Sequence, residues 1–120
     1  MLERESYVSL ATYRRDGRSV ETAIWFAAEG PSLWAFTARD SGKVKRLRNS
    51  PRARVAACDA RGKVHGAWRH AQAYIVDDPQ RIAHALGLLR AKYGLLMRVT
   101  DFFSRLSGRF QSRAYLEIKL

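Results

Sequence analysis

Apolar and polar residues alternate along most of the first 76 positions of the chain, which is the pattern of β-strands. Val8, Leu10 and Thr12, for example, alternate with Tyr7, Ser9 and Ala11. The strands expected from this alternation cover 7–13, 20–27, 33–37, 54–58 and, less regularly, 64–76. Turn signals such as Asp16-Gly17 separate these runs and predict hairpins, and therefore an antiparallel sheet.

Helical spacing replaces alternation in three segments. A short basic helix is expected over 42–49, with Val44 and Leu47 facing inward. Asp78-Pro79 is a cap and first-turn signal for a helix that ends at Gly94. A second amphipathic stretch carries Leu96, Val99, Phe103 and Leu106, and Gly108 is expected to break it before a last strand over 115–120. Six strands without long helical crossovers predict a small closed or split barrel.

Composition narrows the class of protein. A chain of 120 residues with 47% apolar content suits one domain over 1–120. No apolar run approaches the roughly 20 residues of a membrane span, and the first five residues are too charged for a signal peptide. Cys58 is the single cysteine, so no internal disulfide forms and the reducing cytoplasm is expected. The three histidines show no ligand spacing with Cys58, so no metal site is expected.

The net charge of +11 favours anionic partners, namely nucleic acid, phosphates or polycarboxylates, although a general composition bias would give the same value. The segment 36–52 concentrates this charge. Ser41 is placed to cap the basic helix, and Lys43 and Arg46, three residues apart, share one face of it. Helix N–H groups, a hydroxyl and two cations together predict an anion pocket. A solvated helix face is the alternative, and Lys45, Arg48 and Arg52 lie on another side.

No motif identifies a catalytic centre. The sequence has no nucleophile elbow, Walker loop or dinucleotide fingerprint, and its aspartates lie mainly at turns and caps. If the protein is an enzyme, a bound cofactor is therefore expected to do the difficult chemistry. Trp25, Trp34 and Trp68 could line a flat aromatic ligand, but packing in the core or an interface is the more common role of such residues.

Several of these segments together are similar to one known family. They are Tyr7-Val8-Ser9-Leu10-Ala11-Thr12, Asp16-Gly17, Trp25-Phe26, Phe36-Thr37 and Ser41-Gly42-Lys43-Val44-Lys45-Arg46-Leu47-Arg48-Asn49-Ser50-Pro51. The chain resembles the pyridoxamine 5′-phosphate oxidase-like split-barrel superfamily, and within it the flavin/deazaflavin branch described as coenzyme F-420-dependent. The resemblance implies a mainly β fold of the FMN-binding type, a six-stranded antiparallel split β-barrel with flanking short helices. It also implies a homodimer with cofactor sites at the subunit interface.

The resemblance also assigns site residues. Thr37, Ser41, Gly42, Lys43 and Arg46 would bind the cofactor phosphate, and the strand segment Thr22-Ala23-Ile24-Trp25 would run along the ring through backbone contacts. The oxidases proper carry an Arg-Lys pair where this chain has Gly42-Lys43, and the glutamine that they use near the flavin falls near Gly66. These departures argue against oxidation of pyridoxamine phosphate.

The expected function is hydride transfer between coenzyme F-420 and an unidentified small molecule, with no catalytic residue assigned. The phosphate and glutamate carboxylates of the F-420 tail suit the extra basic residues, and FMN is the alternative cofactor. A cofactor carrier without turnover is a second hypothesis. A nucleic-acid-binding module is a third and less favoured one, because alternation places most aromatic residues in strands rather than beside the exposed cations.

Overall fold

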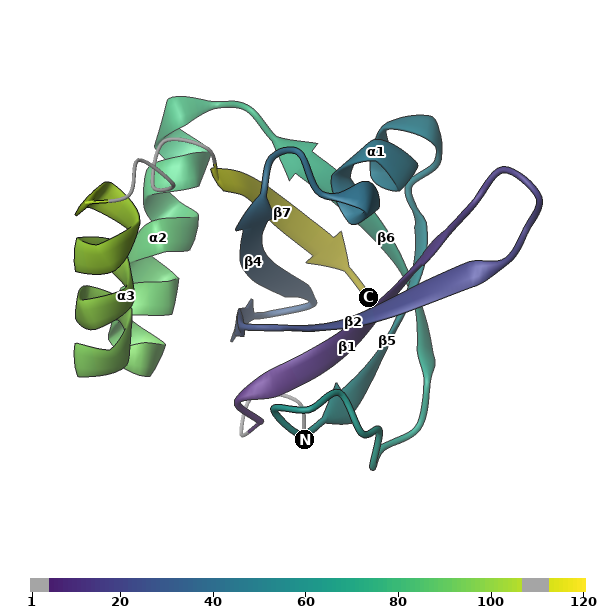
Figure 1. The fold of residues 1–120 in the computed structure, drawn as a ribbon, viewed down its shortest axis with the longest axis horizontal. Coiled ribbons are helices and arrows are strands. Elements are labelled where there is room, and N and C mark those ends of the chain that lie inside the picture. The colour runs from purple at the N-terminus through teal and green to yellow at the C-terminus, as the bar shows by residue number, and fades with distance from the viewer. Residues whose placement is uncertain (1–4, 107–112) are drawn as a thin grey trace.

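A strongly curved antiparallel sheet carries the helices of this protein (Figure 1). The computed structural model describes residues 5–106 and 113–120. Within these residues the elements are β1 (Tyr7–Tyr13), β2 (Ser19–Ile24), β3 (Phe26–Glu29), β4 (Ser32–Ala38), α1 (Gly42–Asn49), β5 (Arg52–Cys58), β6 (Arg69–Val76), α2 (Pro79–Tyr93), α3 (Leu95–Leu106) and β7 (Arg113–Lys119). None of the helices in this part of the chain is long and apolar enough to cross a membrane.

The sheet is a barrel with one open seam. Its strand order is β2-β1-β5-β6-β7-β4-β3, so β2 and β3 are the two edges. These edge strands are consecutive in the chain and are separated only by Trp25. The sheet therefore curls until its edges approach each other, and β2 contacts β4 without forming a strand pair with it in the described residues. The architecture is a split barrel rather than a closed one.

The expected strand count of six is wrong, because the run over 20–27 is two strands. Ile24 at the end of β2 lies opposite Val8 of β1, whereas Phe26 at the start of β3 lies opposite Ala35 of β4. The chain changes its pairing partner at Trp25, which gives seven strands in the described residues.

The run expected over 64–76 is also shorter than predicted. Val64 forms only an isolated bridge with Cys58, and β6 begins at Arg69. At Gly66 an added Cβ atom would lie 3.1 Å from the Cβ atom of Ala57, so a residue without a side chain allows this close approach to β5.

Turn residues make the contacts that their sequence predicted. The Asp16 carboxylate accepts the backbone N–H of Arg18 at 3.1 Å, and Gly17 has a φ of 91°. At the turn after β5, the Asp59 carboxylate accepts the backbone N–H groups of Arg61 and Lys63, both at 2.9 Å. These contacts confirm the expected turns and leave both aspartates in structural roles.

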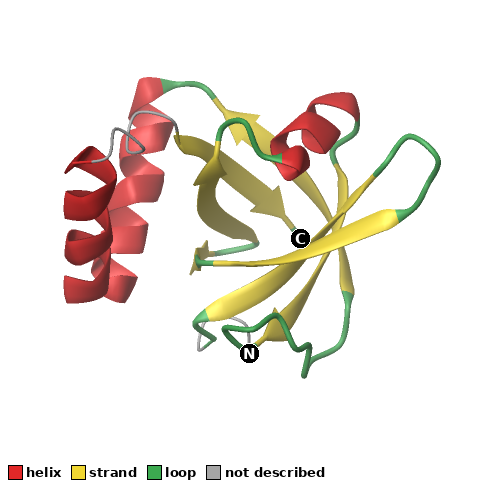
Figure 2. Cartoon of the chain, in the orientation of Figure 1, coloured by secondary structure: helices red, strands yellow, loops and turns green. Residues whose placement is uncertain are grey.

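The helices cover two parts of the barrel, as Figure 2 shows. Helix α1 lies against β1 and β6, and its Val44 and Leu47 are buried, as predicted. Helix α2 packs against β3 and β4, and α3 packs against α2 on its outer side (Figure 1). The Asp78 carboxylate accepts the Arg81 N–H at 3.3 Å, which confirms the predicted cap. The predicted breaker Gly108 lies outside the described residues.

The core fills the inside of the barrel and continues under α2 and α3. The interior cluster includes Val8, Leu10, Ile24 and Phe26. Trp34, which was a candidate ligand contact, is buried between the sheet and α2, so packing is its role. The barrel is therefore solid, and a ligand of any size has to bind on its outside or along its seam.

Candidate functional site

The N-terminus of α1 is the strongest candidate for a binding site. The chain leaves β4 at Ala38, turns, and starts the helix at Gly42, with Ser41 in the extended conformation of an N-cap residue. The first N–H groups of an α-helix have no partner within the helix, and they form its positive end. The first turn of α1 contains no acidic residue to offset this charge.

The Ser41 hydroxyl does not form the capping hydrogen bond that the sequence predicted. Its backbone conformation is that of a cap, but its side chain makes no cap contact. The Oγ atom is buried and has no hydrogen-bond partner among the described residues. A buried hydroxyl without a partner is unfavourable by about 1–3 kcal/mol, so a hydrogen bond to a ligand at the helix start would stabilise it.

Arg46 reaches back one turn to the same end of the helix. A Cβ atom on Gly42 would lie 2.7 Å from Arg46 Nη1, so the guanidinium covers the first residue of α1. Its Nε donates to the Thr12 hydroxyl of β1 at 2.6 Å, which fixes the side chain in this position. A side chain at residue 42 would therefore displace the Arg46 guanidinium from this position.

Lys43 adds a second cation to the helix start. Burial, and then the neighbouring charge of Arg46, lower the pKa of the Lys43 ammonium. Partial burial, and then the charge of Arg14, lower the pKa of the Arg46 guanidinium, which still stays protonated at neutral pH. In the part of the chain that the structure describes, no carboxylate forms an ion pair with Lys43, Arg46 or Arg14. Cations at the positive end of a helix are unfavourable unless an anion joins them.

The second group of candidate residues lies on the edge strand β2. Thr22 lies opposite Leu10 of β1, and its Oγ1 atom is buried without a hydrogen-bond partner. Because β2 is an edge strand that lies near β4, one side of its backbone is open to a ligand along the seam. Ala23 and Ile24 continue this edge toward Trp25.

Trp25 is turned toward the helices instead of a free surface. Its ring stacks on Tyr93 of α2, with centroids 4.6 Å apart and planes 13° apart, and its edge meets Phe36. The Tyr93 hydroxyl accepts the N–H of Phe26 at 2.9 Å, which fixes the point where β2 passes into β3. The half-buried side chain of Trp25 therefore packs against α2.

The structure brings together Ser41, Gly42, Lys43 and Arg46, and it adds two residues that the sequence did not identify. These are Thr12, which holds Arg46, and Arg14, whose charge acts on it. The alternation of Val8, Leu10 and Thr12 was the only signal that could have placed Thr12 on the inner side of β1. Thr37 lies near the end of β4 and has no hydrogen bond to the group among the described contacts.

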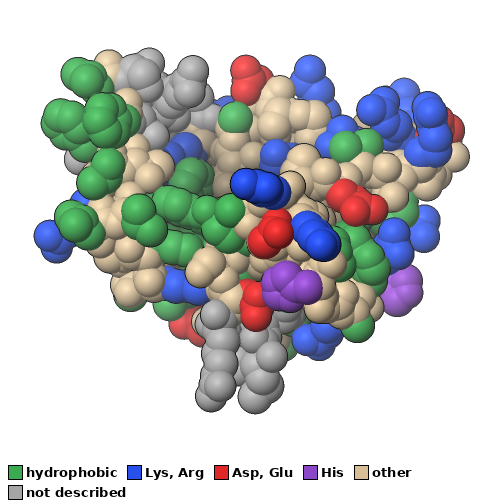
Figure 3. All heavy atoms as spheres, turned by 60° about the horizontal axis from the view of Figure 1, so that its bottom comes forward, with side chains coloured by type: hydrophobic (Ala, Val, Ile, Leu, Met, Phe, Trp, Pro, Cys, Tyr) green, Lys and Arg blue, Asp and Glu red, His purple; other side chains and the backbone are tan. Residues whose placement is uncertain are grey.

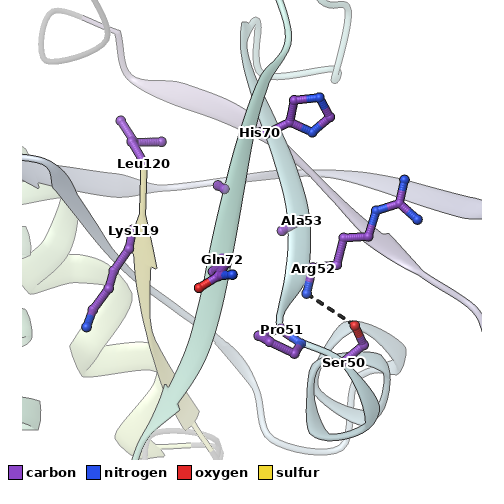
Figure 4. A pocket seen from close by; sticks show the side chains of 9 residues that line it. Ser50, Pro51, Arg52, Ala53, His70, Gln72, Lys119 and Leu120 are labelled. Atoms are coloured by element: carbon purple, nitrogen blue, oxygen red, sulfur yellow. Dashed lines mark hydrogen bonds between the residues drawn. The ribbon is translucent and has the colours of Figure 1, made fainter.

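A hollow of about 580 Å³ lies at the other end of α1. Its lining includes Ser50, Arg52, His70 and Lys119, and Arg52 N–H donates to Ser50 Oγ at 3.3 Å. Figure 4 shows that the Arg52 and His70 side chains extend to one side, away from Lys119. These charges do not converge on one point, so the hollow is the weaker candidate for a phosphate.

Exposed aromatic faces beside cations would have favoured a nucleic-acid surface. Arg52 lies over the ring of Tyr13, 4.0 Å from its centroid, and Arg54 lies over Trp68 at 5.0 Å. Both rings are half-buried and covered by arginine. They are therefore not free stacking platforms for bases.

The fold and the helix-start geometry define a split-barrel protein. The family model described as pyridoxamine 5′-phosphate oxidase matches residues 1–120, so the chain belongs to this family. No curated protein matches the chain.

Solved structures show the same fold at low sequence identity. The conserved hypothetical protein Rv2991 from Mycobacterium tuberculosis is 21% identical with a TM-score of 0.70, and the alignment covers 97% of this chain and 73% of that one. An FAD-binding protein from Mesorhizobium loti is 18% identical with a TM-score of 0.64, covering 99% and 82%. HutZ, the heme storage protein from Vibrio cholerae, is 10% identical with a TM-score of 0.72, covering 97% and 82%. The fold thus occurs in proteins with different cofactors.

Proposed function

We propose that this protein binds a phosphate-bearing flavin or deazaflavin and uses it as an oxidoreductase on a small-molecule substrate. One observation carries the proposal. The positive end of α1 holds Lys43, the guanidinium of Arg46 and the unpartnered hydroxyl of Ser41, with no carboxylate paired to either cation in the described residues. A bound phosphate would satisfy the hydroxyl and both charges together.

The ring of the cofactor would lie along β2, at the open seam of the barrel. The backbone of Thr22, Ala23, Ile24 and Trp25 would face it, and Thr37 would complete the phosphate group from β4. The FAD-binding relative supports a flavin-type ring for this fold. When bound, the cofactor supplies the hydride chemistry. The protein's own residues anchor its phosphate and orient its ring.

Coenzyme F-420 suits the charge distribution better than FMN. Its tail carries glutamate carboxylates in addition to a phosphate, and α1 exposes Lys45 and Arg48 beyond the anchoring group. Arg52 and the hollow that it lines follow directly after the helix. At about 1.5 Å per residue, the eight residues of α1 span about 12 Å, a distance that a short peptide-like tail covers.

A second copy of the chain would complete the site. The ring has β2 on one side only, and a dry ring pocket needs a cover on the other. We propose a homodimer in which the partner supplies this cover, as the family resemblance implies. Light scattering of the purified protein tests it, and a monomer that binds cofactor tightly would contradict it.

A cofactor carrier without turnover is the second candidate. No acid or base is assigned in the site, and the heme storage protein shows that this fold also occurs in a storage protein. Hydride transfer from the reduced cofactor to a panel of unsaturated small molecules distinguishes the two. Tight binding with no transfer to any of them favours the carrier.

Cofactor titration tests the proposed site. FMN and coenzyme F-420 are titrated by fluorescence at low and high salt against the wild type, Lys43→Ala and Arg46→Ala. Each variant removes one charged contact, so Kd is expected to rise at least about tenfold. Lys45→Ala is the matched control, because it removes the same charge from an exposed position of the same helix and should leave FMN binding unchanged. Unchanged affinity in both site variants would refute the site, and equal affinity for the two cofactors would remove the preference for F-420.

A further inference from the structure

The outward face of α3 is an exposed apolar surface. Leu95, Leu96, Val99, Phe102, Phe103 and Leu106 are 46 to 75% exposed. Among the described residues, the one other exposed large hydrophobic side chain is that of Tyr74, which is 39% exposed. Figure 3 shows hydrophobic side chains gathered on the side of the molecule where α3 lies. Surfaces of this kind usually contact a partner or a membrane.

The opposite side of α3 is fixed to the domain, so this face cannot turn inward. Met97 is fully buried beside Ala27 and Leu89. The Asp101 carboxylate is buried and accepts from Arg90 of α2 at 3.1 Å and from Arg113 of β7 at 2.8 Å. Among the described residues, the apolar face therefore points away from the rest of the domain.

The shape of the face is a single convex ridge. At 100° per residue, its six side chains occupy a stripe about 120° wide along the twelve residues of α3. Together they expose on the order of 600 Å² of apolar area, at the upper limit for a monomer. A stable protein interface takes about 800 Å² from each partner, so this ridge alone is small for a dimer.

Charge distinguishes between two possible partners of this face, a second copy of the chain and a lipid surface. Arg98 is exposed and lies about 100° from Val99 on the rim of the stripe, and the acid of α3, Asp101, is buried and already ion-paired. The whole chain carries +11. Two copies of α3 would bring their basic rims together without exposed acids to pair with them. A lipid bilayer with an apolar interior and anionic headgroups complements both the apolar stripe and its basic rim.

We propose that α3 docks onto the surface of an anionic lipid bilayer. The helix would lie in the plane of the interface, with its apolar stripe among the acyl chains and Arg98 at the headgroups. The rest of the domain stays in water, because the helix is attached through Met97 and Asp101. This inference does not depend on the cofactor site.

Vesicle flotation tests this proposal. The purified protein is mixed with vesicles of phosphatidylcholine alone and of phosphatidylcholine with phosphatidylglycerol. Binding to the anionic vesicles is expected, at least about tenfold weaker in Phe103→Ser and in Leu106→Ser. Arg98→Gln should weaken it several-fold at low salt. Tyr74→Ser is the matched control, since it removes an exposed aromatic residue outside α3, and it should bind like the wild type.

Three results would overturn the proposal. The first is no binding to anionic vesicles, and the second is equal binding to neutral and anionic ones. The third is a lipid-free dimer, seen by light scattering, that Phe103→Ser converts to a monomer, because the face would then belong to a second copy. Thermal unfolding of each variant checks that the exposed substitutions leave the fold intact.

Discussion

Replacing Gly42 by alanine should separate cofactor binding from stability. The added Cβ atom would lie 2.7 Å from Arg46 Nη1, closer than such atoms approach, so one of the two must move. The guanidinium is the end of a flexible side chain, so it moves and the backbone stays. Its bond to Thr12, 2.6 Å long, is then weakened or broken. The anion site loses a positioned cation, while α1 loses no helical hydrogen bond.

Gly42→Ala is expected to weaken cofactor binding without lowering the free energy of unfolding. A hydrogen bond to a charged group contributes about 1.5–3 kcal/mol, so Kd for FMN should rise roughly ten- to hundredfold. Alanine is the better helix former by up to about 1 kcal/mol, so the free energy of unfolding should stay the same or rise slightly. Fluorescence titration and urea unfolding measure the two quantities on the same sample.

Gly87→Ala is the matched control for this variant. Gly87 lies inside α2, and an added Cβ atom there meets nothing within 4 Å. This substitution should raise the free energy of unfolding by about 1 kcal/mol and leave Kd unchanged. Wild-type affinity in Gly42→Ala would mean that Arg46 in its present position does not contact the ligand, which would contradict its place in the phosphate site.

Three further predictions concern the neighbours of the site and the helix layer. Thr12→Val removes the acceptor that holds Arg46, so FMN affinity should fall several-fold, and an unchanged Kd would show that this contact does not position the guanidinium. Asp101→Asn removes the buried charge that faces Arg90 and Arg113, so the free energy of unfolding in urea should fall by about 3 kcal/mol. A fall below about 1 kcal/mol would contradict the buried ion pairs. Folding raises the pKa of the Tyr93 phenol to about 12, chiefly through burial, so the unfolded chain loses this proton first as the pH rises. The free energy of unfolding should therefore fall between about pH 10 and 12, and Tyr93→Phe should remove this dependence.

The start and end of α1 were predictable from the sequence, but the break in the second strand was not. Gly42 and the Ser50-Pro51 pair delimit the helix, and both signals act locally. At Trp25 the alternation runs on without interruption, because Ile24 and Phe26 both face the barrel interior. The exchange of one pairing partner for another leaves no trace in a pattern of period two.

Only those features of the anion site that depend on neighbouring residues could be predicted from the sequence. The positions of Lys43 and Arg46 follow from helix spacing, but the contact of Arg46 with Thr12 joins residues 34 positions apart. The Ser41 hydroxyl was expected to cap the helix, and its buried, unpartnered state depends on the packing of the finished fold.

The amphipathic pattern of α3 was also visible in the sequence, but its orientation was not. An apolar stripe usually faces the core. Here the inner side of the helix is held by Met97 and by the charge of Asp101, so the stripe faces outward. These buried contacts on the inner side reverse the simplest interpretation of the pattern.

A crystal structure of the protein with bound FMN or coenzyme F-420 would locate the cofactor phosphate itself. The phosphate is expected at the N-terminus of α1, within hydrogen-bond distance of Ser41 Oγ and Lys43 Nζ, and the ring is expected along β2. A phosphate held in the hollow beside Arg52 and His70, with the start of α1 left empty, would contradict this placement.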